Sequence, residues 1–372
     1  MVLNKAFLLF LRLGLYFVEP TENDVIFMAS LNCENWEDIK ELSIKQAVSS
    51  ILLDGINSVY EIGGNKAVNS LIPTYWWKQF ILEWTSFSLN TETRNKQQEL
   101  IMNEMGDLWS KGGCKVMIMK GLANGLYYPK PFHRTPGDID CFLFNDYDKG
   151  NNIAVMAGAS INEEWYKHSE IYYKGEVFEN HKYLIPIRDN KDSRLLEEEL
   201  KKSLEDVSLV NYPGSRCYIP TPQFCAMFLT IHAFEHFLYE GMRMKQLLDW
   251  AMFLQKDQNS VDWDNYYSFC DRYKLRKFSD GITAICINNL GVTIFNKDIV
   301  FSNIYADKIL HSIFFDDDYV YCEGKGKWYN RYHVVKNIIQ HRWKFEELYD
   351  QSIWSRLWQE GRGLLFRTEQ GC

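Results

Sequence analysis

Residues 120–144 decide the fold and read KGLANGLYYPKPFHRTPGDIDCFLF. Near the end of this stretch, Asp138 and Asp140 lead directly into an apolar run. Successive side chains of a strand point to opposite faces, so the two aspartates would share one face while Ile139 anchors the strand in a core. Two carboxylates held side by side repel each other unless a cation or a proton lies between them. Because Mg²⁺ takes oxygen ligands, often carboxylates together with substrate phosphates, the pattern indicates metal-assisted phosphoryl transfer.

Taken alone, an Asp-x-Asp pair is also typical of a surface turn whose aspartates cap a helix. The preceding sequence favours a strand instead. An apolar run at 116–119 ends at Lys120-Gly121, and a short helix and a turn that contains Arg134 follow it. The aspartates then head a second apolar run, which places them at the start of a strand.

Residues 111–215 mix strands and helices, whereas the flanking regions do not. The expected strands lie near 116–119, 138–144, 165–174, 176–187 and 207–210, and the expected helices near 122–128, 153–159 and 193–204. Lys174-Gly175 would join two of these strands in a hairpin.

The region 1–110 is helical by its periodicity, because apolar side chains recur three and four residues apart over 42–53 and 76–109. We expect the first of these helices to end near Gly55. The N-terminal run is apolar like a signal peptide, but Arg12 interrupts it, no small-residue cleavage site follows, and it is too short to span a membrane. An amphipathic first helix is the better interpretation.

The region 216–372 returns to helices at Thr221-Pro222, where Thr can cap and Pro suits the first helical position. Further helices are expected near 245–254, 262–273, 278–290, 298–315 and 329–348. We expect the tail after Trp358 to be loosely docked.

The composition is that of a soluble globular protein large enough for two or three domains, with 372 residues, 46% of them hydrophobic and 24% charged. The net charge of −8 argues against a protein that coats nucleic acid, since phosphate binding relies on a basic field. The nine cysteines form no C-x-x-C pair, so we interpret them as reduced thiols of a cytoplasmic protein.

The motifs resemble the bacterial family of uncharacterised nucleotidyltransferases, which belongs to the polymerase-β-type superfamily. The similarity is specific over 116–144, in the pattern Lys-Gly, Tyr-Pro and Arg-x-x-Gly-Asp-x-Asp. The segment 177–181, VFENH, resembles a family strand that carries Glu or Asp, one further residue and His. A looser match covers 232–254. The resemblance implies an α+β fold, with a nucleotidyltransferase core and a small mixed sheet at 111–215 between helical regions at 1–110 and 216–372.

The resemblance also implies a mechanism. Three carboxylates, which here would be Asp138, Asp140 and Glu179, hold two Mg²⁺ ions. One ion lies on the triphosphate of an NTP such as ATP, and the other lowers the pKa of an acceptor hydroxyl, which attacks the α-phosphate and expels pyrophosphate. The acceptor is unidentified, and the acidic charge argues against a long nucleic acid. Glu179 could instead be an exposed hairpin residue.

The superfamily usually has Gly-Gly or Gly-Ser at the first turn from strand to helix, where backbone N–H groups receive phosphates. This chain has Gly121-Leu122 instead, preceded by Lys120. Basic side chains would then bind the phosphates, Arg134 through its bidentate fork. Alternatively, Arg134 could pair with Asp138 or a neighbouring carboxylate. The residues that we expect to contact the nucleotide are Lys120, Gly121, Arg134, Gly137 and His181.

Several other residues have two interpretations. His181 would share a strand face with Glu179 and orient it, or be a structural histidine. His232 and His236 have the spacing of a zinc pair but no evident third ligand, so we interpret them as core or substrate-pocket histidines. Asp249 lies in an apolar helix and should pair with an Arg or a His. The aromatic residues of 127–132 could stack on a base or simply pack.

Two rivals to catalysis on a general acceptor remain. One is a catalytically silent scaffold or binding protein that keeps the nucleotidyltransferase shape, because fold does not fix function. The other is a toxin-like nucleotidyltransferase that acts on tRNA.

Overall fold

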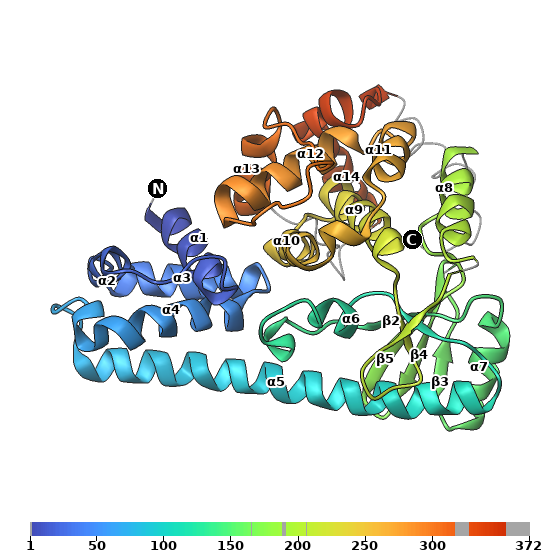
Figure 1. Cartoon of the computed structure of the whole chain (residues 1–372), viewed down its shortest axis with the longest axis horizontal. Coiled ribbons are helices and arrows are strands. Elements are labelled where there is room, and N and C mark those ends of the chain that lie inside the picture. Colours follow the sequence, from blue (N-terminus) through green and yellow to red (C-terminus); the bar gives the residue numbers. More distant parts are fainter. Residues whose placement is uncertain (1, 165, 188–190, 206, 317–326, 355–372) are drawn as a thin grey trace.

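The computed structural model describes residues 2–164, 166–187, 191–205, 207–316 and 327–354 (Figure 1). Within these residues a seven-stranded sheet lies between two groups of helices, which confirms the α+β class. None of the described helices combines the length and the apolar character that crossing a membrane requires.

The N-terminal region is helical, as predicted. Its elements are α1 (Val2–Gly14), α2 (Glu22–Ala29), α3 (Cys33–Lys45), α4 (Ser49–Gly63), the 3-10 turn η1 (Gly64–Ala67) and α5 (Thr74–Lys111). The amphipathic first helix is confirmed, because α1 buries Phe7 and Phe10 completely. The long α5 runs beneath both the N-terminal helices and the sheet (Figure 1).

The helix expected over 42–53 is in fact two helices. The chain breaks between α3 and α4, where Ala47 has a positive φ of 55°. Gly55 does not end α4, which continues to Gly63. A Cβ at Gly55 would instead collide with the carbonyl oxygen of Phe10, so this glycine allows α1 and α4 to cross closely.

The sheet is mixed. Its strands are β1 (Met117–Ile118), β2 (Ile139–Phe142), β3 (Ser160–Asn162), β4 (His168–Tyr173), β5 (Glu176–His181), β6 (Val210–Asn211) and β7 (Tyr218–Ile219). They lie in the order β3-β4-β5-β2-β1-β7-β6. The pairs β2–β5 and β1–β7 are parallel and the others antiparallel. The helical elements between them are α6 (Leu122–Gly125), η2 (Pro131–His133), α7 (Tyr147–Met156) and α8 (Lys191–Lys202).

The core differs from the prediction in two places. The helix placed at 153–159 begins at Tyr147 and ends at Met156, and the unexpected strand β3 follows it. The sheet also extends past residue 215, because β7 pairs with both β1 and β6. The hairpin between β4 and β5 is confirmed, with Lys174 and Gly175 both at positive φ.

The two faces of the sheet pack on different layers. Cys141 and Phe178 lie in one core cluster with Trp109 of α5. Met119 and Phe142 point the other way and join the core cluster that contains the C-terminal helices. The sheet is therefore held between α5 and the C-terminal helical region (Figure 1).

The C-terminal helices begin as predicted, with Thr221 accepting a hydrogen bond from the backbone N–H of Phe224 and Pro222 in the first turn. They are α9 (Pro222–Tyr239), α10 (Met244–Asp257), η3 (Gln258–Ser260), α11 (Trp263–Arg272), α12 (Arg276–Ile285), the π-helical turn η4 (Cys286–Leu290), α13 (Ala306–Phe315), α14 (Lys327–Gln340) and the π-helical turn η5 (Lys344–Leu348). The helix expected over 298–315 is shorter and begins at Ala306. The tail after Trp358 lies outside the described residues.

Candidate active site

The three carboxylates expected to act together come from two adjacent parallel strands. Asp140 of β2 is the register partner of Glu179 of β5, so the two side chains share a face of the sheet. Asp138 precedes β2 by one residue and Asp140 by two, which gives it the same orientation. Because Ile139 and Cys141 pack in the α5 cluster, the carboxylates face the C-terminal helices.

Two basic side chains lie against these carboxylates. Lys120 Nζ is 2.9 Å from Asp140 Oδ1, and His181 Nε2 is 3.1 Å from the same oxygen. His181 Nε2 is also 3.3 Å from Glu179 Oε2. Asp140 and Glu179 therefore converge on a single nitrogen, in the place where a cation between carboxylates would lie.

The two aspartates have opposite electrostatic environments. Burial alone would raise the pKa of Asp140, but Lys120 and His181 hold it well below its usual range. The pKa of Asp138 is raised by burial and by the negative charges of Glu179 and Asp140. Adjacent titratable groups whose pKa values are pushed apart are typical of acid–base and metal chemistry.

Gly121 makes the turn that follows Lys120 beside the start of β2. Its φ is +66°, a conformation that favours glycine, and a Cβ there would lie 3.5 Å from the carbonyl oxygen of Asp138. Lys120, which precedes this turn, contacts Asp140.

A family model described as uncharacterised nucleotidyltransferase matches residues 32–291, which is more than half of the chain and includes every site residue described above. The chain belongs to this family. The description of the family implies nucleotidyl transfer, with an NTP as the substrate. Comparison with curated proteins and with solved structures gave no match. The family match begins at Asn32, which caps α3, so it covers α3, α4 and α5 but not α1 and α2.

Arg134 forms an ion pair with Asp249 of α10. Its Nε and Nη2 donate to the two carboxylate oxygens of Asp249, each at 2.7 Å. Asp249 also accepts from Asn124 Nδ2 at 3.1 Å and from the hydroxyl of Tyr128 at 2.8 Å. The expectation that Asp249 pairs with an Arg or a His is confirmed, because its partner is Arg134. Of the carboxylates considered for Arg134, the one that it contacts is Asp249 and not Asp138. The buried hydroxyl of Tyr128 serves this network.

Helix α5 fixes the loop that leads to the carboxylates. Asn95 Nδ2 donates to the carbonyl oxygens of Phe132 and Arg134, at 2.8 and 2.9 Å. One turn further along, Gln98 Nε2 donates to the carbonyl oxygen of Gly137 at 2.6 Å and to Glu176 Oε2 at 2.8 Å. This helix thus ties the residue before Asp138 to the first residue of β5.

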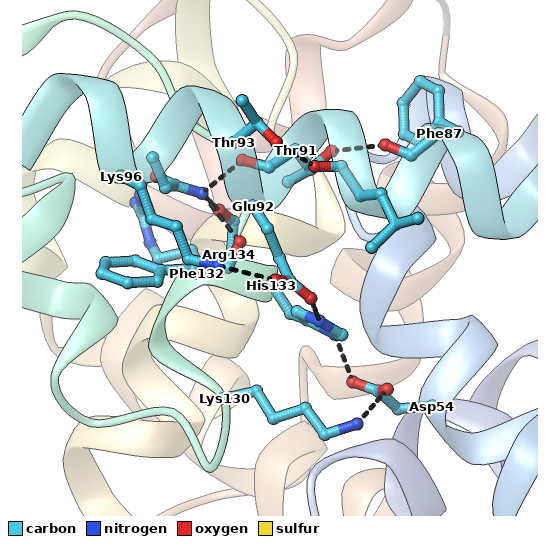
Figure 2. A network of polar contacts seen from close by, with 12 residues as sticks. Asp54, Phe87, Thr91, Glu92, Thr93, Lys96, Lys130, Phe132, His133 and Arg134 are labelled. Atoms are coloured by element: carbon cyan, nitrogen blue, oxygen red, sulfur yellow. Dashed lines mark hydrogen bonds and ion pairs between the residues drawn. The ribbon is translucent and has the colours of Figure 1, made fainter.

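His133 forms the second anchor of the loop, as Figure 2 shows. Its Nδ1 lies 2.6 Å from a carboxylate oxygen of Asp54 on α4, and its Nε2 lies 2.7 Å from Glu92 on α5. Lys130 Nζ contacts the other oxygen of Asp54 at 2.6 Å. The sequence reasoning missed this network, although a lone Asp54 within the apolar run ILLDGI was a signal for a buried ion pair.

The sequence reasoning also missed two lysines near the carboxylates, whereas it named His232 as a core or substrate-pocket histidine. Burial and the charge of Arg134 lower the pKa of Lys245 to about 7, and its Nζ lies 3.7 Å from where a Cβ would stand on Gly137. The pKa of Lys167 is lowered by burial and by Lys120. The pKa of His232 on α9 is lowered for the same two reasons. These groups lie around the carboxylates, and burial together with neighbouring positive charges disfavours their protonated forms.

His232 and His236 do not form a metal group with a third His, Cys, Asp or Glu in the part of the chain that the structure describes. Their rings lie 4.5 Å apart, edge to face, and His236 Nδ1 is 2.8 Å from a carboxylate oxygen of Glu240. The pocket interpretation suits His232, whose pKa is affected by both Lys120 and Asp140.

Proposed function

We propose that this nucleotidyltransferase moves a nucleoside monophosphate from an NTP to a hydroxyl-bearing acceptor and releases pyrophosphate. The observation that carries the proposal is the register pairing of Asp140 with Glu179 on parallel strands, with Asp138 two residues ahead on the same face. Three carboxylates on one rigid face are costly unless cations occupy the space between them.

The residues fit a divalent metal. Asp138, Asp140 and Glu179 supply the oxygen donors that Mg²⁺ prefers, and we propose two ions in keeping with the three carboxylates. Their present neighbours Lys120 and His181 already lie where positive charge is needed. When bound, the metal would neutralise the triphosphate and make the acceptor hydroxyl more acidic.

The remaining chemistry belongs to side chains of the protein. Asp138, which is exposed whereas Asp140 is buried, would accept the proton of the acceptor hydroxyl on a carboxylate oxygen. The acceptor oxygen then bonds to the α-phosphorus, and the bond from that phosphorus to pyrophosphate breaks. Lys120 and Lys245 would stabilise the charge on the phosphates, with Arg134 positioned by Asp249 beside them.

The test is transfer of label from α-³²P-labelled NTPs, with Mg²⁺ and cell extract as the source of acceptor. The double variant Asp138→Asn with Asp140→Asn should lose labelling. Asp148→Asn, an exposed acid in the first turn of α7, is the matched control and should retain it. Unchanged labelling in the double variant would overturn the proposal.

Binding of the nucleotide separates the rivals. If the wild-type protein binds no NTP, the result favours a catalytically silent scaffold. If the labelled product is an intact tRNA with an extended 3′ end, the acceptor is tRNA. Labelling of a small molecule or a protein identifies the acceptor class directly.

A further inference from the structure

A second group of potential metal ligands lies beside the three carboxylates. His168 of β4 is the register partner of His181 of β5, and Glu179 lies two residues from His181 on the same face. One ligand atom from each of these three residues lies within 4.8 Å of the other two. Because all three come from one β-hairpin, their backbone positions are fixed before any ion binds.

The two oxygens of Glu179 face different imidazoles. Oε1 is 3.7 Å from His168 Nε2, and Oε2 is 3.3 Å from His181 Nε2. A metal with ligand bonds of about 2.0–2.2 Å holds its ligand atoms roughly 3–3.5 Å from one another. The atoms therefore need only small side-chain rotations to enclose an ion.

The orientation of His181 suits a metal ligand. Its Nδ1 is 3.2 Å from the carbonyl oxygen of Tyr183, an acceptor for the proton on that nitrogen. A histidine held in this way directs Nε2 as the ligand, and such a contact to a backbone carbonyl is typical of metal-binding histidines. Nε2 in turn points at two carboxylates, so a cation shared with them is favoured there.

The site is accessible. The side chain of His181 is fully buried, whereas those of His168 and Glu179 are 13% and 21% exposed. An ion could enter from the side of these two residues while His181 forms the floor of the site.

The donor set selects the class of ion. Mg²⁺ prefers oxygen ligands and keeps its waters, whereas imidazole nitrogen suits first-row transition metals and zinc. Two imidazoles with one carboxylate, and open positions for water or substrate, is a common set for such ions.

We propose that His168, Glu179 and His181 bind a divalent transition metal, of the class of Mn²⁺, Co²⁺ or Zn²⁺. The site goes beyond the proposed function, because it adds nitrogen ligands on the side of Glu179 away from Asp138 and its occupancy does not depend on nucleotidyl transfer. Glu179 is shared between this site and the carboxylate site, so the two centres are adjacent.

Cobalt is the probe, because Co²⁺ bound through imidazole absorbs visible light. The full chain, stripped with a chelator and dialysed, is titrated with Co²⁺ in the absence of nucleotide. A saturable visible spectrum should appear, and His168→Asn should weaken the binding that produces it by about tenfold or more, since loss of a group that only orients a metal ligand already costs about 10–100-fold. His236→Asn is the matched control, since its ring contacts Glu240 and belongs to no described metal group, and it should bind Co²⁺ like the wild type.

Pulsed electron paramagnetic resonance gives a readout that does not depend on affinity. With Cu²⁺ or Mn²⁺ bound, the wild type should show coupling to two imidazole nitrogens and His168→Gln to one. Circular dichroism and the unfolding midpoint verify that both His168 variants are folded. Absence of Co²⁺ binding, an unchanged titration in His168→Asn, or a spectrum without imidazole nitrogen would each overturn the proposal.

The Asp138→Asn variant separates this site from the proposed activity. It should lose nucleotide transfer but keep the Co²⁺ spectrum. If transfer fails in the wild type while Co²⁺ binds through both histidines, the metal site stands and the proposed function falls. If transfer proceeds and Co²⁺ does not bind, the proposed function stands and the metal site falls.

Discussion

The ion pair between Arg134 and Asp249 is the contact whose loss should be most costly. Arg134 is 6% exposed and Asp249 is 5% exposed, and two hydrogen bonds of 2.7 Å join them. The pair links the loop before Asp138 to α10. We predict that Asp249→Asn and Arg134→Met each destabilise the protein strongly, because each leaves the other partner buried without its counter-charge.

The magnitude follows from the burial and the number of contacts. Breaking a buried ion pair from one side costs about 3–5 kcal/mol. In Asp249→Asn the amide NH₂ group faces the N–H and O–H donors of Arg134, Asn124 or Tyr128, and the N–H donors among them cannot accept its protons. Hydrogen bonds of the amide therefore replace only part of the lost interaction. The double variant Arg134→Met with Asp249→Asn removes both charges and should cost much less than the two single changes together, with a coupling of about 2–3 kcal/mol.

The assay is urea unfolding of the full chain, followed by circular dichroism and tryptophan fluorescence. The matched control is Glu104→Gln, which breaks the exposed pair between Lys174 and Glu104 and should leave the midpoint close to that of the wild type. Losses below about 1 kcal/mol in both single variants, or strictly additive losses in the double variant, would refute this reasoning.

Three further outcomes are expected. Burial alone lowers the pKa of His133, but its hydrogen bonds to Asp54 and Glu92 outweigh burial and the charge of Lys130 and raise it. The stabilisation from His133 is therefore present below the unfolded pKa of about 6.5 and is lost as the pH rises through the folded pKa. The urea midpoints of the wild type and His133→Gln should differ more at pH 6 than at pH 9. Equal differences at the two pH values would contradict a raised pKa for His133. Gly121→Ala should cost about 1–3 kcal/mol in urea unfolding because of its positive φ, whereas Gly158→Ala, also at positive φ but with open space around it, shows how much of that cost is backbone strain alone. Because the pKa of Lys245 is lowered to about 7, its charge is disfavoured in the folded state. Lys245→Met should therefore raise the unfolding midpoint, by more at pH 6 than at pH 9, and should weaken NTP binding measured by calorimetry. A lower midpoint would contradict a destabilising charge on Lys245.

The local features of the fold were predictable because they depend on neighbouring residues. The spacing of Asp138 and Asp140 placed both aspartates on one face and Ile139 on the other, and in the structure Ile139 packs in the α5 cluster. The cap at Thr221 and the hairpin turn at Lys174-Gly175 have equally local causes. The predicted boundary at Gly55 was wrong because its role is set by a distant helix, at the crossing of α1 and α4.

The candidate site was predictable only in part, for the same reason. Asp138 and Asp140 could be identified from their spacing, and Glu179 from the family resemblance. The partner of Arg134 could not, because Asp249 lies 115 residues away in the sequence and many carboxylates were equally plausible. His168 carried no local pattern, and it meets His181 only through the pairing of β4 with β5.

The role of α5 changes how the N-terminal region should be understood. By periodicity it was only a helix of a helical scaffold, yet Gln98 bonds both the carbonyl oxygen of Gly137 and the side chain of Glu176. These two residues start the segments that carry Asp138 and Glu179, so one side chain of α5 sets the distance between the two halves of the carboxylate set. Asn95 fixes the same loop one turn earlier on that helix. The family match begins at the cap of α3 and includes all of α5, as expected if the helix is part of the machinery that positions the carboxylates.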